Sequence, residues 1–346
     1  MFSHACKWLK VGALALAAGG AWAAYQDPLD VPARTVVRPE AGQINAVAAA
    51  GKRIVAIGRR GVIVYSDDGG QRWSQAAVPV SVDFTAMHFP TPEVGWVVGH
   101  GGVLLQTSDG GKTWAKRLDG RLLGKLLTDH YAQQSGDVAN AAKAIAAEGP
   151  IHPFLDVWFE SEQVGYVIGA FNLILRTEDG GKTWEPWFDR TDNPKGLHLY
   201  SVRGAGGEVY IAAERGLVMR LDKAAKRFVA VPTPYQGSYF RVVVRPDNVM
   251  VFGLRGNAFR SDDGGKNWQP LDATVKTALT ASDVMGDGRV ILGTQGGDIL
   301  VGTSRGENFT AVNGAKRMPL AAVVPVGPDT VAYGGLTGVG VLQLKK

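Results

Sequence analysis

Three features of the sequence predict an all-β fold. An octapeptide of pattern Ser/Thr-x-Asp-x-Gly-x-x-Trp recurs, an apolar β-prone run precedes each copy, and the repeats follow one another at intervals of roughly forty residues. That interval is typical of a four-stranded propeller blade. The sequence therefore predicts a seven-bladed β-propeller with four-stranded blades. We expect an N-terminal strand to close its last blade, and a helical insert between blades 2 and 3.

The octapeptide is interpreted as a structural turn. Its Asp accepts hydrogen bonds from nearby backbone N–H groups, and its Gly supplies the positive φ of a tight connection. Its Trp is expected to begin the fourth strand and to pack on the neighbouring blade. Each repeat aligns only one acidic residue, without the spacing of a calcium loop. The four copies contain Asp68 and Trp73, Asp109 and Trp114, Asp179 and Trp184, and Asp263 and Trp268.

Four short strands recur in each of the first three repeats, with the octapeptide between the third and fourth. They are expected at residues 44–49, 53–57, 62–65 and 72–76, then 84–89, 95–98, 103–106 and 113–117, then 154–159, 165–168, 173–176 and 183–187. Two later repeats have lost the octapeptide but keep an aromatic residue, Phe228 or Phe309, in place of Trp. An aromatic replacement is what a packing role predicts.

The seventh blade contains only three predicted strands, at residues 320–326, 330–333 and 338–344. We expect residues 35–37 to supply its fourth strand, because that pairing would leave no open sheet edge.

The long interval between Trp114 and Trp184 contains a segment with helical periodicity. Within residues 118–149, apolar side chains recur at helical spacing, and residues 137–147 are rich in Ala. The recurring residues are Leu122, Leu123, Leu126, Leu127 and Tyr131. We expect a helical hairpin inserted in the propeller, either packed as a lid or in contact with a partner.

Residues 1–23 have the pattern of a cleavable signal peptide. Lys7 and Lys10 precede an apolar run that is too short to span a bilayer, and Ala21-Trp22-Ala23 resembles a cleavage site. We expect export to the periplasm, cleavage near Ala23, and one propeller domain over residues 24–346. The single cysteine, Cys6, lies upstream of that site. The formal net charge of +5 does not indicate nucleic-acid binding.

The face opposite the octapeptides is the candidate binding face. In an antiparallel meander, the turns between strands 2 and 3, the connections between blades and the insert all share one edge. Arginines occupy one aligned position in three of those turns, where guanidinium groups can hold carboxylates or phosphates. The alternative is that they are solvated or pair with acids such as Glu214. The candidate rim consists of Arg60, His100, His198, Arg215, Arg241 and Arg255. The remaining histidines show no metal-ligand spacing, and no metal or cofactor is expected.

Residues 95–114 read Gly-Trp-Val-Val-Gly-x-Gly-Gly-x-Leu-Leu-x-Thr-x-Asp-Gly-Gly-Lys-Thr-Trp, and residues 165–184 form a closely similar unit. The unit resembles the photosystem II stability/assembly factor-like (BNR/Asp-box repeat) β-propeller family, over about residues 35–346 apart from the insert. The resemblance implies a non-catalytic, exported propeller that binds a membrane protein, or a peptide segment of one, through an arginine-bearing face. Relatives in bacteria without photosystems imply an accessory role beside a membrane transporter or exporter component.

A sialidase-like or other Asp-box glycoside hydrolase is the alternative function. Such an enzyme needs an arginine triad, a Tyr/Glu pair and an acidic catalyst on the loop face, and Tyr200, Tyr239 and Glu214 are candidates. However, the Phe-Arg-Ile-Pro motif expected before the first octapeptide is absent. Fold alone does not distinguish the two functions, and the sequence favours binding.

Overall fold

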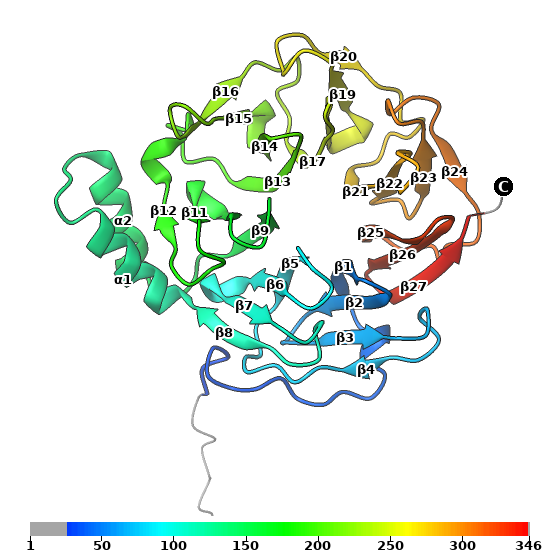
Figure 1. Cartoon of the computed structure of the whole chain (residues 1–346), viewed down its shortest axis with the longest axis horizontal. Coiled ribbons are helices and arrows are strands. Elements are labelled where there is room, and N and C mark those ends of the chain that lie inside the picture. The colour runs from blue at the N-terminus through cyan, green and yellow to red at the C-terminus, as the bar shows by residue number, and fades with distance from the viewer. Residues whose placement is uncertain (1–25, 345–346) are drawn as a thin grey trace, which may run out of the picture.

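The computed structural model describes residues 26–344, which form a ring of seven antiparallel sheets (Figure 1). Six sheets have four strands and the seventh has three, each in sequence order. The first strand of each sheet lies nearest the ring axis (Figure 1). The predicted seven-bladed propeller is therefore confirmed. The predicted signal peptide lies outside the described residues.

The strands agree with the predicted repeats to within a few residues. Blades 1 to 3 comprise β1 (Ile44–Ala50), β2 (Arg53–Gly58), β3 (Ile63–Ser66) and β4 (Ser74–Gln75); β5 (Phe84–His88), β6 (Gly95–Gly99), β7 (Leu104–Thr107) and β8 (Ala115–Leu118); and β9 (Phe154–Phe159), β10 (Gly165–Gly169), β11 (Ile174–Thr177) and β12 (Glu185–Pro186). Blades 4 and 5 comprise β13 (Leu199–Ala205), β14 (Glu208–Ala213), β15 (Val218–Asp222) and β16 (Arg227–Val231); and β17 (Tyr239–Val244), β18 (Val249–Gly253), β19 (Ala258–Ser261) and β20 (Gln269–Pro270). Blades 6 and 7 comprise β21 (Leu279–Val284), β22 (Val290–Thr294), β23 (Ile299–Gly302) and β24 (Thr310–Val312); and β25 (Leu320–Gly327), β26 (Thr330–Gly335) and β27 (Gly338–Gln343).

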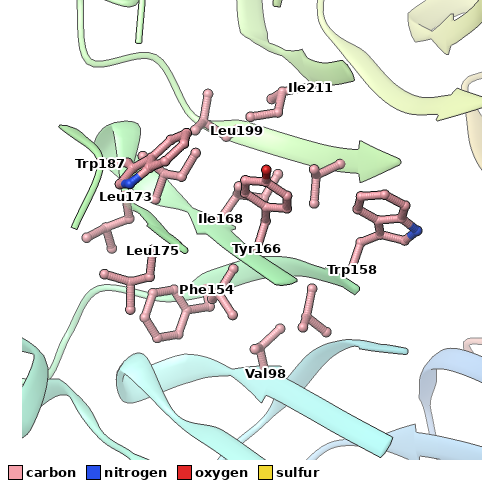
Figure 2. Packing of buried hydrophobic residues seen from close by; sticks show 14 of the residues in the cluster. Val98, Phe154, Trp158, Tyr166, Ile168, Leu173, Leu175, Trp187, Leu199 and Ile211 are labelled. Carbon is pink, nitrogen blue, oxygen red and sulfur yellow. The ribbon is translucent and has the colours of Figure 1, made fainter. Parts of the chain in front are cut away.

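The core lies between the faces of adjacent blades. Figure 2 shows Tyr166, Ile168 and Leu173 of blade 3 lying between Val98 of blade 2 and Leu199 of blade 4, and all five are buried. Because both faces of a blade are covered, its middle strands are continuous apolar runs, as in β6 and β10, where every residue is buried.

The octapeptide of blade 2 forms the predicted stapled turn. One carboxylate oxygen of Asp109 accepts hydrogen bonds from the Thr107 hydroxyl at 2.8 Å and from the N–H groups of Lys112 and Thr113 at 2.9 and 3.0 Å. The other three copies repeat the central bonds around Asp68, Asp179 and Asp263. In blade 3, the hydroxyl and N–H of Thr183 lower the pKa of Asp179 to about 2.

The aromatic residue of the octapeptide packs between blades, as predicted, although Trp114 lies directly before β8 and not within it. Trp184 of blade 3 meets Trp96 of blade 2 edge-on, with ring centroids 5.8 Å apart. Phe228, the replacement in blade 4, meets Tyr166 of blade 3 at 5.7 Å. The degenerate repeat therefore keeps the contact after losing the Asp.

Asp109→Ala is expected to lower the free energy of unfolding by about 1 kcal/mol, because it removes a turn cap. Urea unfolding measures this loss. Partner binding at low temperature should be unchanged, since the octapeptide lies opposite the candidate face. Lost binding in a folded Asp109→Ala protein would contradict the structural role.

The prediction that residues 35–37 close blade 7 is wrong. None of them lies in a strand, Val37 is 92% exposed, and no described strand pairs with the outer edge of β27. The N-terminal segment lies instead across the outer edges of blades 1 and 2. Its backbone bonds there explain the difference: the N–H of Ala33 donates to the Val78 carbonyl, and the N–H of Ser81 donates to the Pro28 carbonyl.

Side-chain packing closes the ring between blades 7 and 1. Ile44 and Val47 of β1 share a buried cluster with Ala322 and Val324 of β25. The 3-10 turn η1 (Pro39–Ala41) contacts β27.

The predicted insert consists of two helices between β8 and β9, α1 (Gly120–His130) and α2 (Asp137–Glu148). The Asp119 carboxylate caps α1 by accepting the N–H groups of Arg121 and Leu122. Leu123 and Leu127 are buried, whereas Leu122 is half exposed. The hairpin lies outside the ring beside β12 and does not cover the axis (Figure 1), so it is not a lid over the centre.

Candidate functional site

The propeller has two faces. The turns between the second and third strands of the blades lie on one of them, which we call the turn face. The insert belongs to it, because Gly102, in the β6–β7 turn η2 (His100–Gly102), touches Gly120 at the start of α1. The octapeptides lie on the opposite edge. There Arg53, at the start of β2, donates to the carbonyl oxygens of Asp109 and Gly110 at 3.0 Å.

Arg60, Arg215 and Arg255 occupy the same position in the turns of blades 1, 4 and 5. Their φ angles are 53°, 53° and 57°, a left-handed conformation that is uncommon for a residue with a side chain. All three are exposed, and none forms an ion pair with a residue in the range 26–344. Their guanidinium groups therefore lack acidic partners among these residues, although the Asp83 carboxylate accepts the backbone N–H of Arg60 at 2.8 Å.

A glycine after each arginine explains the turn. A Cβ on Gly216 would lie 2.0 Å from the carbonyl oxygen of Tyr235, and one on Gly256 would lie 2.0 Å from that of Val275. Tyr235 and Val275 belong to the connections that lead into the next blade. Each connection therefore packs directly against the glycine of the turn. This contact fixes the turn and keeps the arginine that precedes the glycine at the surface.

The two histidines of the predicted rim differ in their surroundings. His100 is exposed in the turn of blade 2. His198 is half-buried, with its Nδ1 accepting the N–H of Phe171 at 2.9 Å. His198 therefore anchors a turn and is not a free ligand on this nitrogen.

Glu214 organises the start of blade 4. Its carboxylate accepts the N–H of His198 at 2.9 Å and the hydroxyl of Tyr200 at 3.3 Å. Burial and the Glu214 charge raise the pKa of Tyr200 to about 12. Tyr239, the other tyrosine candidate for hydrolysis, is fully buried and does not reach the face.

An aromatic path that the sequence did not predict crosses blades 3 to 5. We call His152, Phe171, His198, Tyr200 and Phe240 the aromatic arc. Successive ring centroids lie 5.5, 4.6, 6.5 and 5.4 Å apart. Phe171 is 54% exposed, and it has the turn position that arginine has in blades 1, 4 and 5.

The inner strand of every blade has a bulge at its second residue. The register shift recurs in all seven inner strands, and such bulges re-aim side chains next to functional sites. We call these residues the bulge ring: Asn45, Thr85, Leu155, Tyr200, Phe240, Thr280 and Ala321.

The bulge ring has a polar and an apolar part. The side chains of Asn45, Thr85 and Thr280 donate to backbone carbonyls of the next blade at 2.7, 2.7 and 2.6 Å. Blades 3 to 5 have Leu155, Tyr200 and Phe240 there instead. Tyr200 and Phe240 thus belong both to the aromatic arc and to the bulge ring.

An axial channel of about 340 Å³ is lined by all seven inner strands. Arg241 lines this channel and is not part of the exposed rim. Asp156 is buried, and one of its oxygens accepts Arg203 Nη1 at 2.6 Å and the N–H of Val202 at 2.9 Å. Neither Asp156 nor Arg203 was predicted, because their pairing joins residues of different blades.

The turn face also contains a groove of about 740 Å³ beside Arg215, between the connections into blades 4 and 5. Lys195 and Gln236 line it with Arg215. Arg215 is therefore exposed beside a groove whose lining contains one further basic residue, Lys195, and one acidic residue, Asp192.

The sequence profile of the family described as "Photosynthesis system II assembly factor YCF48" matches residues 43–147 and 148–318. The chain belongs to this family. Members of the family are assembly factors and not enzymes.

One relative is the "Photosystem II assembly lipoprotein Ycf48" of Synechococcus sp. (strain CC9902), 26% identical over 130 residues. The match spans 37% of this chain and 39% of the relative's length. Solved structures of YCF48 bound to D1 peptide and of YCF48 from Cyanidioschyzon merolae share the fold, each with a TM-score of 0.65 at 17% identity. These cover 91% and 90% of this chain and 100% and 98% of theirs.

Among the described residues, no helix has the length and apolar character needed to cross a membrane. The same residues contain no group of three or more His, Cys, Asp or Glu arranged for a metal ion.

Proposed function

We propose that this chain is an exported, non-catalytic accessory or assembly factor that binds a segment of a membrane protein at its turn face. The partner is a membrane protein or a component of a transporter complex. The observation that carries this proposal is the set of three exposed, left-handed arginines without ion-pair partners in residues 26–344. Residues held in such strained conformations cluster at functional sites.

The chemistry of the face indicates the kind of segment. Arg60, Arg215 and Arg255 suit carboxylates on the partner, and the exposed side chains of Phe171 and Ile151, 54% and 62% exposed, suit apolar side chains. Binding sites of this kind combine buried aromatic anchors with charged residues. A partner segment with acidic and apolar residues would contact both the arginines and the exposed apolar side chains.

The relatives support this assignment. One solved relative is bound to a D1 peptide, and another is named as an assembly lipoprotein. A lipoprotein relative agrees with an exported or membrane-associated protein, and the signal-peptide pattern of residues 1–23 suggests the periplasm.

The test replaces Arg60, Arg215 and Arg255 together with Glu and measures membrane partners recovered by cross-linking in cells. We expect recovery to fall at least tenfold, because three attractive charges become repulsive. The matched control is Lys112→Glu, Lys182→Glu and Lys266→Glu, which makes the same charge change at exposed octapeptide positions on the opposite edge. Equal recovery from both triple variants, with equal melting temperatures, would refute the binding face.

A further inference from the structure

The axial channel contains a guanidinium group without an acidic partner. Arg203 pairs with Asp156, but Arg241 forms no ion pair with any residue in 26–344. Its Nη1 and Nη2 donate to the carbonyl oxygens of Phe240 and Ala321 at 3.2 and 3.3 Å. Because a guanidinium has five N–H donors, these two bonds leave donors for a ligand in the channel.

We propose that the axial channel binds a small monocarboxylate with an apolar tail, its carboxylate on Arg241 and its tail extending from the channel toward Tyr200 and Phe240. A planar guanidinium holds a carboxylate by two parallel hydrogen bonds. The channel volume of about 340 Å³ suits a small molecule. This site goes beyond the proposed function and is separate from the exposed arginines.

Two arginines and two aspartates line the channel, so a ligand with one negative charge is opposed less than a dianion. The titratable and charged side chains that line it are His88, Asp156, Arg203, Arg241 and Asp283. Burial, and then the charge of Arg203, lower the pKa of His88 to about 3, so His88 is neutral at pH 7. Asp156 and Asp283 oppose a second negative charge on a ligand. A dianion such as sulfate is therefore disfavoured.

Asp283 makes the binding dependent on pH. Its burial in the channel raises its pKa to about 6. Above this pKa the carboxylate is negative and repels an anion, whereas below it the group is neutral. Carboxylate affinity should therefore rise as the pH falls from 7 to 5.5, a range in which an alkanoate ligand stays mostly ionised.

The apolar part of the bulge ring is the reason that we expect an apolar tail on the ligand. Asn45, Thr85 and Thr280 use their side-chain donors on the neighbouring blades. The rings of Tyr200 and Phe240 lie 5.4 Å apart, and Phe240 directly precedes Arg241 in β17. The channel lining includes Arg241 but neither ring, so a ligand whose carboxylate meets Arg241 would reach the aromatic pair with a chain that extends beyond the lining.

Titration calorimetry with octanoate tests the site, with octylamine and sulfate as probes of charge. We expect octanoate to bind, and Arg241→Gln to weaken it at least tenfold. Arg241→Lys should keep part of the affinity, and Phe240→Ala should weaken octanoate several-fold. Arg255→Gln is the matched control: it removes an exposed guanidinium from the turn of the same blade and should leave octanoate binding unchanged.

A peptide with a free C-terminus, compared with its C-terminal amide, tests whether a chain terminus can supply the carboxylate. Absence of octanoate binding, equal affinity in a folded Arg241→Gln protein, or tighter binding of sulfate would overturn the proposal. If Arg241→Gln does not fold, Arg241→Lys and the affinities at pH 5.5 and 7 decide. Partner cross-linking depends on the exposed arginines, so failure of one proposal is distinguishable from failure of the other.

Discussion

Gly216→Ala is expected to lower the free energy of unfolding by about 3 kcal/mol, from left-handed strain plus overlap with a fixed backbone. Gly216 has φ +79°, and an added Cβ would lie 2.0 Å from the Tyr235 carbonyl oxygen and 3.1 Å from its carbonyl carbon. The obstacle is backbone, so no side-chain rotation relieves it. Urea unfolding followed by far-UV circular dichroism measures the change.

Gly69→Ala is the matched control for this prediction. Gly69 has φ +72°, but nothing lies within 4 Å of its added Cβ. Gly69→Ala should lower the free energy of unfolding only by the strain of the left-handed conformation, about 1 kcal/mol. The difference between the two variants isolates the contact between the turn and the connection. Equal losses would show that the connection does not hold the turn.

Leu29→Ala is expected to destabilise the protein by about 3 kcal/mol, as is typical of a buried Leu. Leu29 is 3% exposed, within the cluster that contains Val80, Val103 and Trp114. Its carbonyl oxygen also accepts Lys116 Nζ at 2.8 Å. The part of the N-terminal segment around Leu29 therefore stabilises blades 1 and 2. Thermal melting of the purified protein measures the loss.

Val37→Ala provides the contrast, because Val37 would be central to a strand that closes blade 7. At 92% exposure it should change the melting temperature by less than the error of the measurement. A large loss from Val37→Ala, with none from Leu29→Ala, would restore the closing strand.

The repeat architecture was predictable because it rests on local signals that recur. The octapeptide requires an Asp for the turn and an aromatic residue for the interblade contact, and both are visible in sequence. The insert was visible as a change of apolar period, and Leu123 and Leu127 are indeed buried.

The closing strand was predicted incorrectly for two reasons. Its sequence signal was weak, and tertiary contacts direct the N-terminal segment along a different path. Residues 35–37 have β propensity, but so short a run does not determine its partner. Contacts distant in sequence decide the path, including the Asp30 carboxylate, which accepts both terminal nitrogens of Arg121 at 2.8 and 2.9 Å.

The candidate site was predictable only in part. Alignment of the turns located Arg60, Arg215 and Arg255 at one position, because a following glycine marks the turn. The bulge ring has no sequence signature, since its seven positions hold six residue types. Arg241 was predicted as part of the rim but lines the channel with Arg203 and Asp156, a placement that depends on three blades meeting at the axis.

The closure of the ring by packing alone has an evolutionary consequence. Ile44 of blade 1 meets Gly334 of blade 7, and Gly70 in the first octapeptide meets Val341 in β27, as Gly181 of blade 3 meets Trp96 of blade 2. The junction between blades 7 and 1 is thus stabilised by the same kind of contact as the junction between blades 2 and 3. Since no described blade borrows a strand from the other end of the chain, duplication or loss of a whole repeat requires no matching change at a terminus. Circular permutation through another connection would likewise leave every blade intact.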